Sequence, residues 1–260
     1  MLAELDRQRV SDALLLAQRE RKQIPGPSRT RPEMTIEDSY AIQDLGIKAR
    51  LADGAIIRGR KVGLTSKAMQ RSSKIDEPDF GTLLGDMFID DGGEVERDRY
   101  CVPRVEIELA FVMGQRLEGP GVGRSEALRA TEYVLPSIEI IDARVEDPRT
   151  ILDTVADNAA AAGIVLGSQR IDASAVDLRW IGGMMYRNQD LEETGLAGGV
   201  LGDPVEALVW LANKLAQFGD RLEEGHVILT GAFVRPVWAE RGDVLTADFG
   251  PMGTVSVQFT

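Results

Sequence analysis

The sequence is poor in residues on which many enzymes and metalloproteins depend. Its 260 residues include one cysteine, Cys101, and one histidine, His226. A single cysteine excludes a disulfide within the chain and a zinc site made of several cysteines. A single histidine excludes a multi-histidine metal site in one chain, and no G-x-S-x-G motif is present to complete a serine hydrolase triad. We expect both residues to be structural, so any chemistry must come from carboxylates, lysines, hydroxyls, backbone amides or a hard metal ion.

Long hydrophobic runs and an excess of positive charge are also missing. The chain carries 42 acidic and 30 basic residues, a net charge of −12. Nucleic acids and anionic membranes bind cationic surfaces, so neither is expected as a partner, although a local basic pocket for a small anion remains compatible. No apolar stretch approaches the ~20 residues of a membrane-spanning helix. Residues 1–21 contain charges that the apolar core of a secretory signal lacks. We therefore expect a cytoplasmic protein.

The periodicity of apolar residues changes along the chain. Apolar residues recur every three or four positions within residues 1–21, and a second helix is predicted from Thr35, an N-cap residue paired with Asp38, to Gly54. From residue 56 onwards, glycines and short β-like runs replace this pattern. The sequence thus predicts an α+β protein, with an N-terminal helical segment (1–55) packed on a β-rich catalytic domain (56–260).

Turn residues and apolar runs predict the elements of the second part. Asp147-Pro148 and Asp203-Pro204 each combine a capping residue with a proline suited to the first helical turn, and they predict helices that end before Gly163 and Gly219. A short helix is expected over 124–132. The predicted strands cover 55–64, 86–90, 105–113, 133–142 and 163–167, followed by a β meander over 226–229, 233–238, 244–249 and 255–259.

Two glutamates in one strand-like run are the sharpest chemical feature. Side chains alternate between the faces of a strand, so Glu106 and Glu108 lie opposite Val105 and Ile107 and about 7 Å apart along the strand. A half-exposed strand with a hydrated acidic face explains this pattern. A pair of oxygen ligands for a metal ion also explains it.

A third glutamate, Glu139, lies in the near-continuous apolar run 134–141, which is typical of a strand buried on both faces. A buried carboxylate without a partner costs several kcal/mol or stays protonated. An ion pair with an arginine would relieve this cost, and so would a divalent cation shared with Glu106 and Glu108. Ligands without histidine or thiol favour Mg²⁺ or Mn²⁺ over Zn²⁺. Three protein ligands would leave positions for water and a chelating substrate.

Two further charged residues are candidates for acid–base chemistry. Lys61 lies among glycines and apolar residues in the run 59–67. A surface lysine fits this pattern, but a lysine near a metal site could bind a carboxylate or, with a lowered pKa, act as an acid or base. Asp79 lies in a predicted tight loop, 77–81, and is either a turn residue or a general base.

Polar groups in three other segments are candidate substrate contacts. Ser66 lies in a polar turn, and Asn158 lies near the end of the predicted helix that begins after Pro148. Thr230-Gly231 offers a hydroxyl and exposed amides that could hold an oxyanion. Each also fits an ordinary turn or a solvent-facing position.

Several of these segments, in this order, resemble the 2-hydroxypentadienoate (2-keto-4-pentenoate) hydratases of the fumarylacetoacetate hydrolase superfamily. The similarity runs from about Thr35 to the C-terminus and rests on 61–69, 77–84, Glu106-Ile107-Glu108, Glu139 and 153–158. The stretches 63–70, 178–181 and 185–188 are most similar to the branch that acts on the seven-carbon diacid 2-oxohept-4-ene-1,7-dioate.

This resemblance implies a mixed, strongly bent β-roll with peripheral helices, assembled into dimers and larger rings. It implies that the three glutamates bind a metal ion, usually Mg²⁺, and that Lys61 and Asp79 are catalytic residues of the substrate pocket. The backbone of Leu83 would lie beside the bound 2-oxo acid. The implied activity is that of a hydro-lyase of aromatic meta-cleavage catabolism, which adds water at C4 of a 2-hydroxy-2,4-dienoate or 2-oxo-enoate to give a 4-hydroxy-2-oxo acid. A second basic residue must hold the distal carboxylate of a diacid, and Lys67, Arg71 and Arg187 are the candidates.

Three alternative functions remain open at this point. The 4-oxalocrotonate decarboxylase branch shares the metal frame and would release carbon dioxide from a 2-oxo-3-enedioate. Hydrolysis of a C–C bond in an acylpyruvate would need a base such as His226 or an activated water. A non-catalytic acid-binding protein with this fold is a further alternative, against which the intact glutamates and Lys61 argue.

Overall fold

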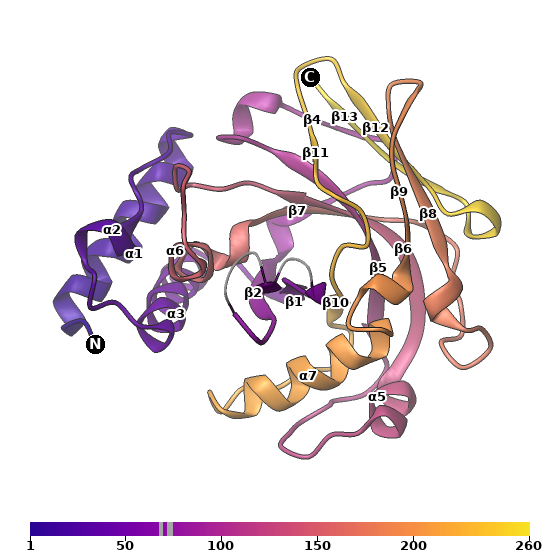
Figure 1. Ribbon diagram of the computed structural model, residues 1–260, viewed down its shortest axis with the longest axis horizontal. Helices are drawn as coiled ribbons and strands as arrows, with labels where there is room; N and C mark the ends of the chain where they lie inside the picture. Colours follow the sequence, from indigo (N-terminus) through magenta and orange to yellow (C-terminus); the bar gives the residue numbers. More distant parts are fainter. Residues whose placement is uncertain (68–69, 72–74) are drawn as a thin grey trace.

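The computed structural model describes residues 1–67, 70–71 and 75–260, so Ala68 and Met69 of the run 61–69 lie outside the described residues. Helices come first along the chain, and strands with further helices follow (Figure 1). The helices are α1 (Glu4–Glu20), α2 (Pro27–Thr30), α3 (Ile36–Ala52), α5 (Arg124–Ala130), α6 (Ile151–Ala156) and α7 (Pro204–Ala216). The strands are β1 (Ile57–Gly63), β2 (Asp79–Leu84), β3 (Phe88–Ile89), β4 (Gly93–Val95), β5 (Arg104–Met113), β6 (Thr131–Ile141), β7 (Ala161–Leu166), β8 (Gly182–Arg187), β9 (Asp190–Leu196), β10 (Val227–Leu229), β11 (Val237–Trp238), β12 (Val244–Asp248) and β13 (Thr254–Phe259). None of the described helices has the length and apolar character needed to cross a membrane.

The described strands form two mixed sheets. The larger has the order β2-β1-β10-β5-β6-β7-β3, with β11 paired to the start of β5, and the smaller has the order β4-β13-β12-β8-β9. Most neighbours are antiparallel, whereas β1–β10, β3–β7 and β13–β4 are parallel. Figure 1 shows β5 and β6 curving between the N-terminal helices on one side and the smaller sheet on the other. This arrangement confirms the predicted α+β fold with a bent mixed sheet.

The core forms along the apolar faces of the two longest strands. Ile107 and Phe111 of β5 and Ile138 of β6 are fully buried, as the alternation of side chains predicts. Helix α7 covers this core with a stripe of buried leucines and alanines at helical spacing. The capping residue Asp203 begins α7 and accepts a hydrogen bond from the amide of Val205, as predicted.

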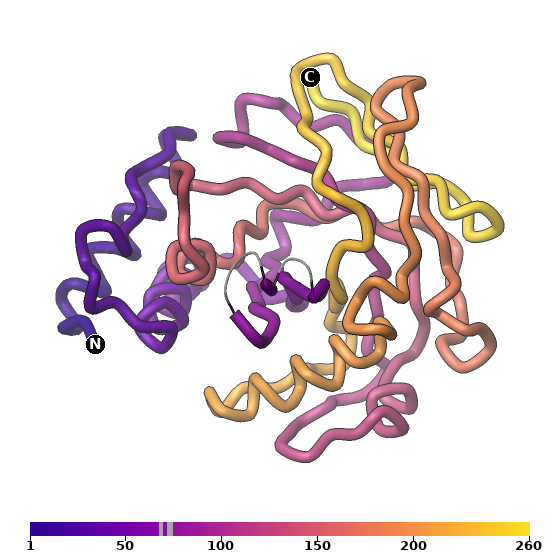
Figure 2. Tube along the Cα trace, in the orientation of Figure 1, coloured from indigo at the N-terminus to yellow at the C-terminus, as the bar shows by residue number. Residues whose placement is uncertain are grey.

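The N-terminal helices pack against α6 and the nearby edge of the larger sheet. Thr35 and Asp38 form the predicted capping box at the start of α3. The apolar cluster of these helices includes Val145 and Ala156, which come from the later part of the chain. The N-terminus lies beside these helices and the C-terminus lies at the smaller sheet (Figure 2). The division into segments 1–55 and 56–260 stays a prediction.

The helix predicted up to Gly163 is wrong in its length and in its cap. α6 ends at Ala156, because the backbone turns left-handed at Asn158 (φ 52°), Ala159 (φ 51°) and Ala160 (φ 59°) before β7 begins. Thr150, and not Asp147, is the N-cap, and it forms a capping box with Asp153.

Several strand predictions also need correction. Asp79, predicted in a loop, is the first residue of β2, because residues 79–84 pair with β1 along their whole length. The predicted strand 86–90 shrinks to Phe88–Ile89 and the predicted strand 233–238 to Val237–Trp238. The β8–β9 hairpin was not predicted, and it pairs with β12 in the smaller sheet.

Candidate functional site

Strand pairing brings the three predicted glutamates together. Glu106 on β5 stands directly opposite Glu139 on β6, and Glu108 follows two residues later on the same face of β5. One carboxylate oxygen from each of the three lies within 4.8 Å of the other two. The sequence predicted the shared face of Glu106 and Glu108, while the register of β5 and β6 supplies the third member.

Few groups near the triad neutralise its charge. The backbone amide of Gly231 donates a hydrogen bond of 2.7 Å to Glu108 Oε2, and Lys61 Nζ lies 3.4 Å from Glu139 Oε1. Both carboxylate oxygens of Glu139 are buried and accept no hydrogen bond from any described residue. Buried polar atoms are normally satisfied, so these two oxygens point to a missing partner.

The electrostatics of the triad fit a divalent cation. Burial, followed by repulsion from Glu139, raises the pKa of Glu106 to about 7. The same two causes raise the pKa of Glu108 well above its ordinary value, and burial raises the pKa of Glu139. Three buried carboxylates thus face the single ammonium of Lys61. A hard cation would satisfy the orphan oxygens and remove the repulsion, and an oxygen-only ligand set suits Mg²⁺ or Mn²⁺.

Lys61 and Asp79 lie side by side on β1 and β2, next to the triad. Burial raises the pKa of Asp79, although Lys61 and the amide of Gly63 act against it. Burial alone would lower the pKa of Lys61, but Glu139 and Asp79 outweigh it, and the net shift is upward. This is the opposite of the lowered lysine pKa considered from the sequence, so the surrounding carboxylates keep Lys61 charged.

A large cavity opens in front of these groups. Its volume is about 1010 Å³, and its wall includes Lys61, Ser66, Asp79, Glu106 and Glu108. Such a volume accommodates a small organic acid together with water. Apolar residues such as Phe233 and Val234 complete the wall. Both catalytic candidates and two of the three metal-ligand candidates therefore face one space.

The other predicted substrate contacts lie behind this wall. Leu83 is fully buried in an apolar cluster. The side chain of Asn158 accepts a hydrogen bond of 2.7 Å from the amide of Thr82 and donates one of 2.9 Å to its carbonyl. The hydroxyl of Thr230 donates to the carbonyl of Leu109 at 3.1 Å. Among these, Ser66 alone is part of the cavity wall, and the substrate roles of Leu83, Asn158 and Thr230 remain predictions.

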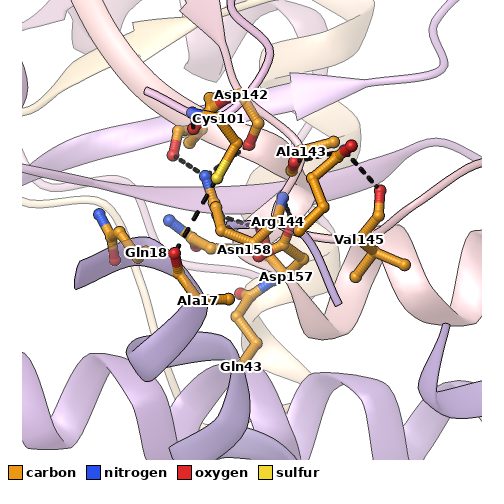
Figure 3. Close-up of polar contacts among 12 residues, drawn as sticks. Ala17, Gln18, Gln43, Cys101, Asp142, Ala143, Arg144, Val145, Asp157 and Asn158 are labelled. Atoms are coloured by element: carbon orange, nitrogen blue, oxygen red, sulfur yellow. Dashed lines mark hydrogen bonds and ion pairs between the residues drawn. The ribbon is translucent and has the colours of Figure 1, made fainter. Parts of the chain in front are cut away.

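A buried arginine network, which the sequence did not reveal, joins the segments that follow β6 and α6 (Figure 3). The Arg144 side chain donates to Asp157 Oδ1 at 2.6 Å and to the carbonyl of Asp142 at 2.6 Å. Asp157 precedes the left-handed turn whose Asn158 binds β2, and Asp142 follows β6 directly. The network thus fixes two strands of the site, β6 with Glu139 and β2 with Asp79.

The single cysteine and the single histidine have structural surroundings, as expected. The amide of Cys101 donates to Asp142 at 2.9 Å, and burial followed by the charge of Asp142 raises the pKa of the Cys101 thiol to about 12. His226 Nδ1 accepts a hydrogen bond of 3.2 Å from the amide of Glu223. Burial lowers the pKa of His226, and the residue is not part of the described cavity wall.

The basic residues proposed for a distal carboxylate lie elsewhere. Arg187 is paired with Glu192 at 2.7 Å, and Lys67 donates to Gln70 at 2.9 Å. As far as the structure describes the cavity wall, neither of them nor Arg71 belongs to it. The basic residues that line it instead, besides Lys61, are Arg104, Arg149 and Arg235. Arg104 precedes Glu106 by two residues, so strand alternation already contained the signal that it shares the face of the glutamates.

Comparison with known proteins agrees with this geometry. Residues 58–260 match the model of the fumarylacetoacetate (FAA) hydrolase C-terminal family. The chain is 48% identical over 257 residues to the 2-oxo-hept-4-ene-1,7-dioate hydratase of Escherichia coli, with 96% of both chains covered. It is 36% identical over 254 residues to the 2-keto-4-pentenoate hydratase of Paraburkholderia xenovorans, covering 97% of this chain and 94% of the relative.

A solved structure has nearly the same fold. The 4-oxalocrotonate decarboxylase from Pseudomonas putida G7, complexed with magnesium and adipate, superimposes with a TM-score of 0.97 at 31% identity, covering 100% of this chain and 99% of the decarboxylase. Fold, triad and sequence similarity agree, and the chain belongs to the fumarylacetoacetate hydrolase superfamily, within the 2-keto-4-pentenoate hydratase family.

Proposed function

We propose that this protein is a metal-dependent hydratase that adds water to a 2-hydroxy-2,4-dienoate or 2-oxo-enoate, with 2-oxohept-4-ene-1,7-dioate as its substrate. The observation that carries the proposal is the convergence of Glu106, Glu108 and Glu139, the first two on the cavity wall, with orphan oxygens on the buried Glu139. The 48% identity to a hydratase of this diacid supports the choice of substrate.

Mg²⁺ is the proposed ion, with Mn²⁺ as the alternative, and the three glutamates would hold it. Bound there, the ion supplies Lewis acidity to the carboxylate and 2-oxygen of the substrate. The presence of magnesium in the structure of a related decarboxylase supports this choice. Oxygen ligands without a nitrogen or sulfur donor agree with it.

In this proposal Lys61 supplies positive charge and Asp79 transfers protons. Lys61 keeps its charge among the carboxylates, so it places positive charge beside the substrate oxygens. Burial raises the pKa of Asp79, so its carboxyl group holds a proton more readily than an exposed one and can pass it to or from the carbon chain. The pocket wall would exclude bulk water and leave room for the single water molecule that adds at C4. The homo-oligomer implied by the family resemblance stays a prediction.

The experiment offers the purified protein dienoates of five, six and seven carbons with Mg²⁺ and follows loss of the conjugated chromophore and the mass of the product. We expect gain of water, fastest with the seven-carbon diacid. Absence of turnover with all three substrates would refute the proposal and leave decarboxylation or a non-catalytic acid-binding role.

Decarboxylation is the second candidate, because the structure with a TM-score of 0.97 is that of a decarboxylase. It predicts release of carbon dioxide from a 2-oxo-3-enedioate without gain of water, so product analysis with this compound as a fourth substrate distinguishes the two. Hydrolysis of a C–C bond with histidine as the base is disfavoured, because His226 is not part of the described cavity wall.

A further inference from the structure

One arginine on the cavity wall, Arg104, forms no side-chain hydrogen bond and no ion pair with any described residue. Arg104 shares the face of β5 with Glu106 and Glu108 and lines the same cavity. Its Nε is buried without a hydrogen bond, and no carboxylate lies within ion-pair distance of its guanidinium in the described part of the chain. Arginine is otherwise well paired when it is partly buried, so this position favours an anion from outside the chain.

The other two arginines of the wall already have partners. Arg149 lies 3.1 Å from Asp147, and Arg235 lies 2.7 Å from Glu193 with 85% of its side chain exposed. Arg149 is nevertheless close enough to Arg104 to repel it. Because Asp147 and Glu193 balance these two charges, the guanidinium of Arg104 is the positive charge that is left without an ion pair among the described arginines of the wall.

The guanidinium of Arg104 packs over the ring of Trp238. Its central carbon lies 5.1 Å from the ring centroid of Trp238, the residue that stands opposite Arg104 in the β5–β11 pairing. Stacking on an aromatic face orients the guanidinium plane and leaves its edge free for donors to reach a carboxylate in a forked geometry. A pre-oriented fork loses less freedom when it binds an anion.

The spacing fits a dicarboxylate of defined length. Arg104 and Glu106 are two residues apart, so their Cα atoms lie about 7 Å apart along the strand and their side chains leave the same face. Six C–C bonds of about 1.5 Å in an extended zigzag place the two carboxyl carbons of a seven-carbon diacid roughly 7–8 Å apart. A diacid that lies along the strand with one carboxyl group at the triad would therefore extend the other toward Arg104, whereas a five-carbon monoacid has no second carboxylate to offer it.

We propose that Arg104, stacked on Trp238, is the residue that binds the distal carboxylate of the substrate and selects a diacid over a monoacid. This inference rests on the proposed function, because the first carboxylate must bind at the glutamate triad.

The test compares two saturated 2-oxo acids of equal chain length, 2-oxoheptanedioate and 2-oxoheptanoate. They differ in the distal carboxylate, and neither has a double bond to hydrate. Binding to the Mg²⁺-loaded protein is measured by calorimetry for the wild type, Arg104→Gln, Arg104→Lys and the matched control Arg187→Gln, whose side chain pairs with Glu192 and is not part of the described cavity wall. We expect the wild type and the control to prefer the diacid by roughly 10- to 100-fold, the worth of a charge-assisted hydrogen-bond pair. Arg104→Gln should lose this preference and bind the monoacid as the wild type does, and Arg104→Lys should keep part of it.

Each outcome decides between the two proposals. If the wild type binds both ligands equally, or if Arg104→Gln weakens both equally, Arg104 does not select the diacid and the inference is wrong, while the proposed function stands. If neither ligand binds the wild type and no dienoate is hydrated, the proposed function itself fails and the inference falls with it. Unchanged monoacid binding in Arg104→Gln also verifies that the variant is folded.

Discussion

Gly63 offers a test of how strictly the site depends on the position of Asp79. An added Cβ at residue 63 would lie 2.2 Å from Asp79 Oδ1 and 3.5 Å from Lys61 Nζ, and contacts of a real Cβ shorter than 3.0 Å are essentially never seen. In Gly63→Ala the Asp79 oxygen must therefore move by at least 0.8 Å, the difference between 3.0 and 2.2 Å. The side chain can swing while the strands stay paired, so the fold should survive.

A displacement of this size matters for chemistry more than for folding. A misplacement of about 1 Å in a catalytic group costs on the order of 100-fold in rate, so we expect kcat for hydration to fall by roughly that factor. The assay follows loss of the dienoate chromophore with Mg²⁺ in excess. Gly182→Ala is the matched control, because its added Cβ would meet its nearest neighbour, Leu196 Cδ2, at an ordinary 3.6 Å.

A double-mutant cycle excludes an indirect effect. If Gly63→Ala acts through the carboxylate, it should add little further loss in an Asp79→Asn background, because the group it displaces has already lost its function. Retention of kcat within about threefold in Gly63→Ala, or a full additional loss in the double variant, would refute the proposed role of Asp79.

Three further predictions concern stability and reactivity. Arg144→Met should lower the free energy of unfolding in urea by about 3–5 kcal/mol, because it leaves Asp157 buried and unpaired. The double variant Arg144→Met/Asp157→Asn should recover much of this loss, and an equal loss in the single and the double variant would contradict the reasoning. Amide hydrogen bonds from Thr35 and Leu2 and the pair with Arg7 outweigh burial and lower the pKa of Asp38, so its ionised form stabilises the fold at neutral pH, and the loss caused by Asp38→Asn should shrink as the pH falls below about 4. A loss that does not depend on pH would be inconsistent with this role. With its pKa raised to about 12, Cys101 should react with iodoacetamide at pH 7.5 far more slowly than a free thiol, and an equal rate would show that it is not protected.

Strand alternation explains why part of the site was predictable. The pattern of residues 105–112 fixes the shared face of Glu106 and Glu108, and the apolar surroundings of Glu139 mark it as a buried carboxylate. Their meeting depends on the register between β5 and β6, which is set by long-range pairing and has no local signature.

Local turn signals do not predict the structure where tertiary contacts dominate. Pro78 and Gly81 indicate a loop around Asp79, yet this segment is a strand, because β1 pairs with it. A Cβ at Gly81 would lie 2.5 Å from the carbonyl oxygen of Asn158, so this glycine permits close approach of the chain rather than a turn. The helix predicted after Asp147-Pro148 ends early for a similar reason, since Asn158 adopts a left-handed conformation and binds the backbone of β2.

Metal binding tests the central claim most directly. Calorimetric titration of the chelator-treated protein with Mg²⁺, supported by elemental analysis, should give one ion per chain in the wild type. The control Glu94→Gln, which changes an exposed glutamate, should behave in the same way. Glu106→Gln, Glu108→Gln and Glu139→Gln should each bind at least tenfold more weakly, because each removes one of the three converging carboxylates. Undiminished Mg²⁺ binding in Glu139→Gln, or no binding in the wild type, would contradict the account.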